Sequence, residues 1–143
     1  MLDDLQDRDD VSRLVTEFYR RAFADPLIGH IFTDVAKMDL NHHLPIITDF
    51  WQTVLFRAGL YRRNALAIHT ALNRRFPLTS EHFDRWLLLW TGTVDELFEG
   101  PKADLAKVQA RRIAGSIQRR LQGRSGSEYE TLLTRDRRAE AGL

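Results

Sequence analysis

Apolar residues recur at every third or fourth position over most of this chain, and that spacing is typical of amphipathic helices. The first such stripe predicts a helix over residues 10–24, with Asp9 or Asp10 as the side chain that caps its start. Pro26 and Gly29 then interrupt the pattern, so we expect the stretch "DPLIGHIF" to leave the helix.

The second stripe predicts a long helix over residues 39–58 that ends at Gly59. Pro45 falls within its first two turns, and proline cannot donate the backbone hydrogen bond that a helix interior requires. We therefore expect this helix either to begin after the proline or to be kinked there. A short third helix, which contains His69, is predicted between Asn64, which can cap its start, and Pro77, which closes the region.

Two further helices complete the pattern. The fourth begins at "LTSEHF", where Thr79 or Ser80 is a suitable N-cap, and stops before Gly100 and Pro101. The fifth is predicted over residues 102–121. No run of residues alternates between apolar and polar well enough to predict a strand, so the predicted fold class is all-α, with about five main helices around one core.

The sequence predicts one domain between two terminal segments. A length of 143 residues and a hydrophobic share of 43% suit a single domain with one packed core. The helical stripes place this domain at residues 10–122, after an N-terminal extension at residues 1–9. Residues 123–143 are polar, and we expect them to form a disordered C-terminal tail.

The composition of the chain argues against several classes of function. The chain has no cysteine, which excludes disulfides, thiol catalysis and cysteine-based zinc or iron–sulfur sites. A net charge of +1, with both signs mixed along the chain, gives no reason to expect nucleic acid as a partner. The acidic start "MLDDLQDRDD" is unlike a signal peptide, and no apolar run approaches the ~20 residues that span a membrane. We therefore expect a cytoplasmic protein, and we take a monomer as the default assembly.

Four polar-tipped side chains occupy apolar faces of the predicted helices, namely Tyr19, His43, His69 and Trp86. For His43 or His69 alone, a hydrogen-bonded core histidine is the more common situation, because each buried ring nitrogen needs a partner. Tyr19, His43 and Trp86 together, however, would bring three hydrogen-bond donors from three helices into one small core. A bound ligand would supply a common acceptor, with His69 as the anchor on its opposite side.

The remaining histidines have simpler interpretations. His30 and His82 lie near turns and helix starts, His42 lies off the apolar stripe, and we expect all three to be solvated. Glu81, His82 and Asp84 crowd a helix start, where their charges suit a capping role. The chain offers no HExxH pair for zinc, no glycine-rich phosphate loop and no G-x-S-x-G element.

Arginines flank the predicted His69 helix on both sides. We expect each one to be a solvated surface residue. As a group they could also meet two carboxylates, such as the propionates of a haem, because guanidinium groups bind carboxylates well. They are Arg57, Arg62, Arg63, Arg74 and Arg75.

With Tyr19, Phe32, His43, His69 and Trp86 set out, the chain resembles the group III truncated haemoglobins. The stretches that carry the resemblance are, in order, "FYRRAFADPLIGHIF", "HHLPIITDFW", "ALAIH" and "HFDRWLLLW". They are spread over nearly the whole predicted domain. The chain also lacks the Gly-Gly pairs that groups I and II usually carry at helix ends.

The resemblance implies a shortened globin fold, a two-over-two helical sandwich around haem b. His69 matches the proximal residue that binds the iron, and Phe32 matches the aromatic residue that packs against the porphyrin. Ile47 matches an apolar position of the distal wall. The residues that match the distal polar positions are Tyr19, His43 and Trp86.

The implied function is binding of oxygen and the related diatomic gases nitric oxide and carbon monoxide, at a pentacoordinate haem iron. Conversion of nitric oxide to nitrate with a reductase partner, or weak peroxidase activity, would be secondary. The sequence places no carboxylate against His69, which favours ligand binding over strong peroxidase chemistry. Two alternatives remain open: a haem-free helical protein-interaction domain, and a haem-based sensor that uses the tail as a partner site.

Overall fold

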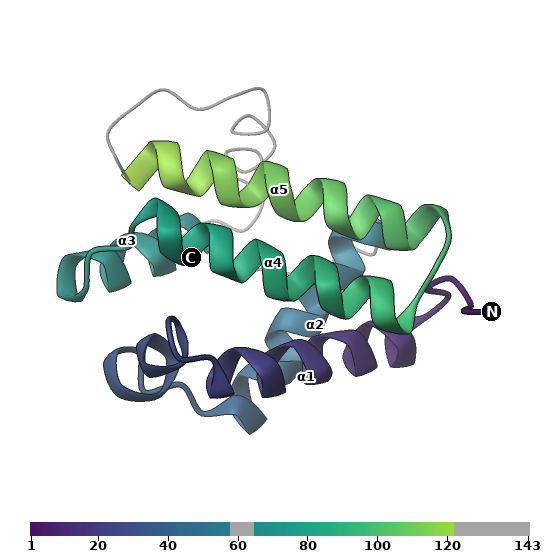
Figure 1. Ribbon diagram of the computed structural model, residues 1–143, viewed down its shortest axis with the longest axis horizontal. Coiled ribbons are helices and arrows are strands. Elements are labelled where there is room, and N and C mark those ends of the chain that lie inside the picture. Colours follow the sequence, from purple (N-terminus) through teal and green to yellow (C-terminus); the bar gives the residue numbers. More distant parts are fainter. Residues whose placement is uncertain (58–64, 122–143) are drawn as a thin grey trace.

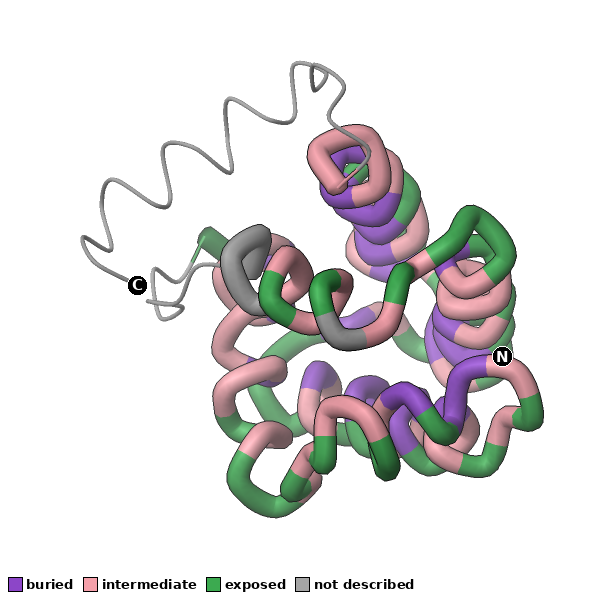
Figure 2. The backbone as a smooth tube through the Cα atoms, turned by 90° about the vertical axis from the view of Figure 1, so that its left-hand side faces the viewer, coloured by how far each residue is buried: buried purple, intermediate pink, exposed green. Residues whose placement is uncertain are grey.

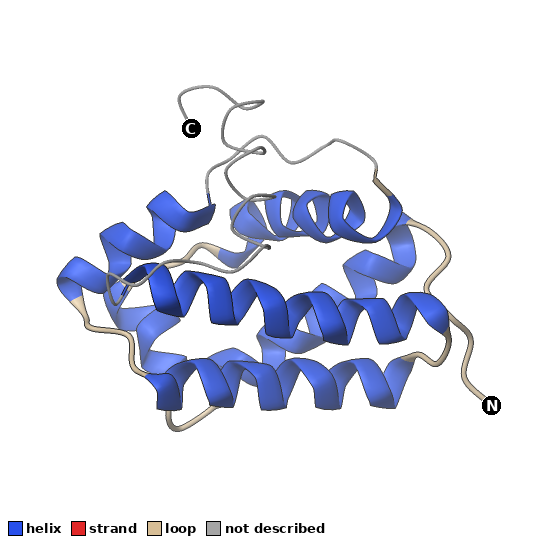
Figure 3. Ribbon diagram, turned by 90° about the horizontal axis from the view of Figure 1, so that it is seen from above, coloured by secondary structure: helices blue, strands red, loops and turns tan. Residues whose placement is uncertain are grey.

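The computed structural model describes residues 1–57 and 65–121, without the side chains of residues 65–68 and 75. In these two ranges the chain forms five α-helices and one π-helix and has no strand (Figure 3). The all-α prediction is confirmed for them. The elements are α1 (Arg8–Ala24), η1 (Ile31–Val35), α2 (Leu40–Phe56), α3 (Ala65–Arg75), α4 (Ser80–Leu97) and α5 (Pro101–Leu121).

The four longest helices form two pairs. α1 packs on α2 and α4 packs on α5, and the pairs meet where α1 contacts α4 and α2 contacts α5. Figure 1 shows α1, α4 and α5 running along the length of the molecule, with α2 crossing behind them. α3 contacts α5 and lies at the end of the molecule where α1 ends and α4 begins. None of the described helices is both long and apolar enough to cross a membrane.

The first helix begins earlier than its apolar stripe predicts. α1 starts at Arg8, and its N-cap is Asp7, whose carboxylate accepts a hydrogen bond from the Asp10 backbone N–H at 3.1 Å. The prediction of Asp9 or Asp10 as the cap is therefore wrong. These two residues lie in the first turn instead, where negative charge is favourable beside the exposed backbone N–H groups.

The second helix extends through Pro45. α2 begins at Leu40, so the proline lies inside the helix, and the expectation that the helix begins only after the proline is wrong. The helix ends at Phe56, and Arg57 then adopts a left-handed backbone conformation with φ of 55°. Such a residue is common at helix ends, because it redirects the chain while satisfying the last carbonyls. The predicted end at Gly59 lies outside the described residues.

The last three helices follow the predicted pattern. The Asn64 cap proposed for α3 lies outside the described residues, as does the predicted tail. Thr79 is the N-cap of α4, and His82 completes its capping box: His82 Nδ1 accepts a hydrogen bond from the Thr79 backbone N–H at 3.0 Å. α5 begins at Pro101, a residue suited to the first turn because it has no N–H to leave unpaired.

The segment between α1 and α2 contains a π-helix that the sequence analysis did not predict. In η1 the Ala36 N–H donates to the Ile31 carbonyl at 2.7 Å, which is the wider spacing of a π-helix. This turn stacks the Phe32 ring on that of Phe23, with 5.5 Å between centroids. Gly29 allows the segment to fold back on α1, because a Cβ at this position would overlap the Phe23 carbonyl oxygen.

Alanine substitutions at two glycines are expected to have opposite effects. Gly29→Ala should lower the free energy of unfolding by about 1–3 kcal/mol, because its methyl group would overlap backbone atoms of α1. Gly92→Ala should raise it by about 0.5–1 kcal/mol, because Gly92 is an exposed position inside α4 whose added Cβ would meet nothing within 4 Å. Urea denaturation measures both. A Gly29→Ala protein as stable as the wild type would contradict the close contact between Gly29 and the backbone of α1.

The N-terminal segment packs on the start of the last helix. Both carboxylate oxygens of Asp4 accept backbone hydrogen bonds from the first turn of α5, from the Lys102 and Ala103 N–H groups at 2.9 Å each. Leu5 is 2% exposed and belongs to the core. These contacts give α5 the side-chain cap that its own preceding residue, Gly100, cannot provide.

The core is fully buried around Trp51 and Trp90, and it is only partly covered near η1 and the first halves of α2 and α4. Trp51, Trp90 and Phe18 are no more than 2% exposed, and Figure 2 shows buried positions along α1, α4 and α5. Large apolar side chains from η1, from the first halves of α2 and α4, and from the residue after α3 are only half-buried. They are Phe32, Leu44, Ile47, Trp86 and Phe76. None of the α3 side chains that the structure describes is buried.

Candidate ligand-binding site

Aromatic contacts connect three of the predicted site residues. The Tyr19 ring lies 5.7 Å from that of Phe32 and 5.0 Å from that of Phe18, measured between centroids. Phe18 in turn lies edge-on to Trp86 at 5.7 Å. Tyr19 is 7% exposed, whereas Phe32 and Trp86 are half-buried. The end of α1 therefore holds one residue from η1 and one from α4 in a continuous set of ring contacts.

The carboxylate of Asp25, the residue after α1, links the end of α1 to the turn before η1 and to α4. Asp25 accepts hydrogen bonds from the Leu27 and Ile28 N–H groups at 2.9 and 3.0 Å, and from Arg85 Nη1 on α4 at 2.8 Å. Burial raises the pKa of the Asp25 carboxyl, but hydrogen bonds from Ile28, Arg85 and Leu27 outweigh burial and leave this pKa below its usual value. Because Arg85 precedes Trp86, the ion pair holds the Trp86 segment of α4 against the turn that leads into η1.

Asp25 and Arg85 were not among the predicted site residues. An aspartate directly before a proline, as in Asp25-Pro26, is a signal for a turn in which the carboxylate accepts nearby backbone N–H groups. This pattern predicts the two local hydrogen bonds, from the Leu27 and Ile28 N–H groups to Asp25. No local sequence pattern predicts the Asp25–Arg85 ion pair, because its two residues are 60 positions apart.

The predicted residues on α2 share one face of that helix. His43 and Ile47 are one turn apart, and both are half-buried. The His43 ring lies 5.3 Å from that of exposed His42, nearly at right angles to it. The expectation that His42 lies outside the apolar stripe is confirmed by its exposure.

His69 lies on the short helix α3. It is half-buried, and its helix packs on α5 at the end of the molecule where α4 begins (Figure 1). In the described parts of the chain, no group of three or more His, Asp or Glu side chains is arranged to hold a metal ion.

The other histidines and the arginines follow their expected surface roles where the structure describes them. His30 is exposed, with its ring 5.2 Å from Phe76, and His82 is half-buried within the α4 capping box. Arg57 and Arg74 are exposed. Arg62, Arg63 and the side chain of Arg75 lie outside the described residues.

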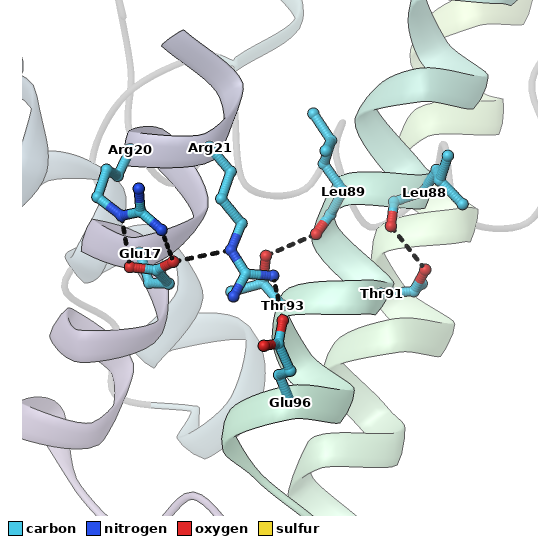
Figure 4. Close-up of polar contacts among 8 residues, drawn as sticks. All are labelled: Glu17, Arg20, Arg21, Leu88, Leu89, Thr91, Thr93 and Glu96. Atoms are coloured by element: carbon cyan, nitrogen blue, oxygen red, sulfur yellow. Dashed lines mark hydrogen bonds and ion pairs between the residues drawn. The ribbon is translucent and has the colours of Figure 1, made fainter. Parts of the chain in front are cut away.

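Ion pairs also join α1 to α4 (Figure 4). Glu17 accepts hydrogen bonds from Arg20 Nε at 2.9 Å and from Arg21 Nε at 2.8 Å. Arg21 Nη1 then lies 2.6 Å from Glu96 Oε2 on α4. The hydrogen bonds from Arg20 and Arg21 lower the pKa of the Glu17 carboxyl from 4.5 to about 2.

The lowered pKa of Glu17 predicts a stabilisation that depends on pH. The folded protein holds the carboxylate more strongly than the unfolded chain, so the stabilisation is complete above pH 4.5 and is lost as the pH falls toward about 2. We expect Glu17→Gln to be less stable than the wild type at neutral pH, and the two proteins to converge through this acidic window. Urea denaturation across that range measures the difference. A difference that stays constant with pH would contradict the role given to Glu17.

No protein-family model matches the sequence, and no curated protein matches it. In three dimensions the chain is similar to the group III truncated haemoglobin of Campylobacter jejuni, with a TM-score of 0.74 to its crystal structure. The match covers 90% of this chain and 98% of that one, at 23% sequence identity. The predicted resemblance is therefore confirmed at the level of the fold: the chain has the architecture of a group III truncated haemoglobin over nearly its whole length.

Proposed function

We propose that this protein binds haem b and, through it, oxygen and related diatomic gases. The observation that carries the proposal is the match in fold to a group III truncated haemoglobin over 90% of the chain. The candidate residues then decide whether this chain could hold the haem group that such a fold suggests.

The side chains fit a flat, largely apolar group. Phe32, Leu44, Ile47 and Trp86 are large apolar residues that the protein alone covers only half. A porphyrin covering their remaining surface would contribute about 25 cal/mol for each Å² of apolar area removed from water. The Trp86 indole N–H also makes no hydrogen bond to any residue that the structure describes, so it is suited to donate to a ligand.

Within this proposal, His69 is the protein ligand of the iron, and Phe32 and Ile47 pack against the ring. Imidazole nitrogen is a common iron ligand in haem proteins. When bound, the haem supplies an iron centre that takes up small diatomic gases.

Three polar residues would determine how long a gas ligand stays bound. Tyr19 and Trp86 are the proposed hydrogen-bond donors, through the phenol O–H and the indole N–H. His43, on the neighbouring helix, is the third candidate donor. A few polar groups on an otherwise apolar site are the usual source of specificity in small-ligand pockets.

The test is the absorption spectrum of the purified protein after addition of haemin, in the ferric, ferrous and carbon monoxide forms. We expect one haem per chain and a sharp Soret band that shifts on reduction and on gas binding. His69→Ala should weaken or remove this band, and added imidazole should partly restore it. His30→Ala is the matched control, because His30 is exposed and should leave the spectrum unchanged.

Two results would count against the proposal. If the wild-type protein binds no stoichiometric haem, the haem-free interaction domain becomes the better interpretation. If His69→Ala retains the wild-type spectrum, the chain still binds haem but the iron ligand is another residue.

A further inference from the structure

The three tryptophans of the chain form one stack. Trp86 and Trp90 lie parallel on α4, with 6.0 Å between ring centroids and 1° between planes. Trp90 stacks on Trp51 of α2 at 4.3 Å and 21°. Phe18 lies edge-on to both Trp86 and Trp90, at 5.7 and 5.2 Å, and so supports the stack from α1.

The stack leads from a half-buried position into the core. Trp86, which we propose as a ligand-site residue, is half-buried, whereas Trp90 and Trp51 are 0% and 2% exposed. Trp90 Nε1 donates to the Ala106 carbonyl at 3.1 Å. A backbone carbonyl is a poor base, so Trp90 would keep this proton if it lost an electron, and the hydrogen bond would stabilise the resulting positive charge.

Indole and phenol rings are the side chains that give up an electron most readily in a chain without cysteine. Stacked indoles share the positive charge that remains, which makes the Trp90–Trp51 pair a favourable place for it. Tyr19 is the competing donor, and its ring contacts those of Phe18, Phe23 and Phe32.

We propose that Trp86, Trp90 and Trp51 form an electron-transfer path that supplies electrons to the ligand site when it meets hydrogen peroxide. This inference rests on the proposed haem function. Reduction of one hydrogen peroxide to two waters consumes two electrons and two protons. In each one-electron step an electron leaves the stack through Trp86, and a tryptophan radical cation remains on the Trp90–Trp51 pair.

A one-electron, one-proton donor such as ascorbate then returns the stack to its starting state. Over a full turnover, one hydrogen peroxide and two ascorbates give two waters and two ascorbyl radicals. The path would hold the oxidising equivalent on the buried Trp90–Trp51 pair until ascorbate returns an electron through the half-buried Trp86.

The experiment is rapid-freeze electron paramagnetic resonance of the haem-loaded protein after addition of hydrogen peroxide. We expect an organic radical signal that narrows when the protein contains ring-deuterated tryptophan and does not change with ring-deuterated tyrosine. Trp90→Phe should abolish the signal from the buried pair. Trp51→Phe, which leaves Trp86 and Trp90 adjacent, should retain a tryptophan radical with altered hyperfine splitting. Phe50→Leu is the control, because Phe50 touches Trp51 edge-on outside the stack and should leave the signal unchanged.

The outcomes separate the two proposals. Haem binding without a tryptophan radical, or with a radical that only tyrosine deuteration narrows, would overturn the path and leave the proposed function standing. An unchanged tryptophan radical in both Trp90→Phe and Trp51→Phe would also overturn it, because the charge would then stay on Trp86. A protein that binds no haem, as judged by its absorption spectrum, would overturn both.

Discussion

Trp90→Ala is expected to lower the free energy of unfolding by about 3–5 kcal/mol, the largest effect on stability that we predict. Trp90 is 0% exposed and contacts rings from α1, α2 and its own helix, through Phe18, Trp51 and Trp86. Its indole N–H also bonds to Ala106 on α5. One side chain therefore touches all four of the long helices, and its removal would leave a cavity where they meet.

Urea denaturation of the haem-free protein measures this effect without a contribution from ligand binding. Leu88→Ala is the matched control on the same helix. Leu88 is 65% exposed, so its substitution should change the free energy of unfolding by less than about 0.5 kcal/mol. Equal effects of the two substitutions would mean that α4 does not present Trp90 to the core.

Tyr19→Phe is expected to accelerate dissociation of oxygen from the ferrous haem protein by roughly 10- to 100-fold. A hydrogen bond to a partly charged acceptor contributes about 1.5–3 kcal/mol, and each 1.4 kcal/mol corresponds to a factor of ten. The substitution removes only the hydroxyl, and the phenyl ring keeps its contacts with Phe18, Phe23 and Phe32. The change in rate should therefore come from the lost donor and not from a rearranged core.

Stopped-flow measurement with carbon monoxide provides the comparison. Carbon monoxide is a weaker hydrogen-bond acceptor than oxygen, so its dissociation should change much less in Tyr19→Phe. Similar acceleration for both gases would indicate a change in access to the site, and the hydroxyl would then not be the donor.

Most helices could be predicted because their apolar stripes are long and regular. The predicted α4 and α5 agree closely with the structure, since a threonine cap, a Gly-Pro break and periodic apolar residues all give the same boundaries. Two elements differ from the prediction. α1 starts at Arg8 because Asp7, three residues before Asp10, provides the local cap, and η1 forms where Gly29 lets the chain return to α1.

The candidate site could be predicted only in part. Side-chain chemistry on apolar faces singled out Tyr19, His43, His69 and Trp86, and the family resemblance added roles for Phe32 and Ile47, which stay proposals. The Asp25–Arg85 ion pair could not be predicted from the sequence, because it joins positions that only the folded chain brings together. The same holds for the stack of Trp51 on Trp90, since nothing in either helix pattern indicates which partner a ring will meet.

The cap that Asp4 places on α5 has a consequence for the order of events during synthesis. The two hydrogen bonds span 98 and 99 positions, so they can form only after nearly all of the described chain has left the ribosome. Until then the faces of α2 and α4 that pack on α5 stay exposed. Closure of this long loop is a late and slow event compared with helix formation. The nascent protein should therefore acquire resistance to proteases abruptly, when the first turn of α5 emerges.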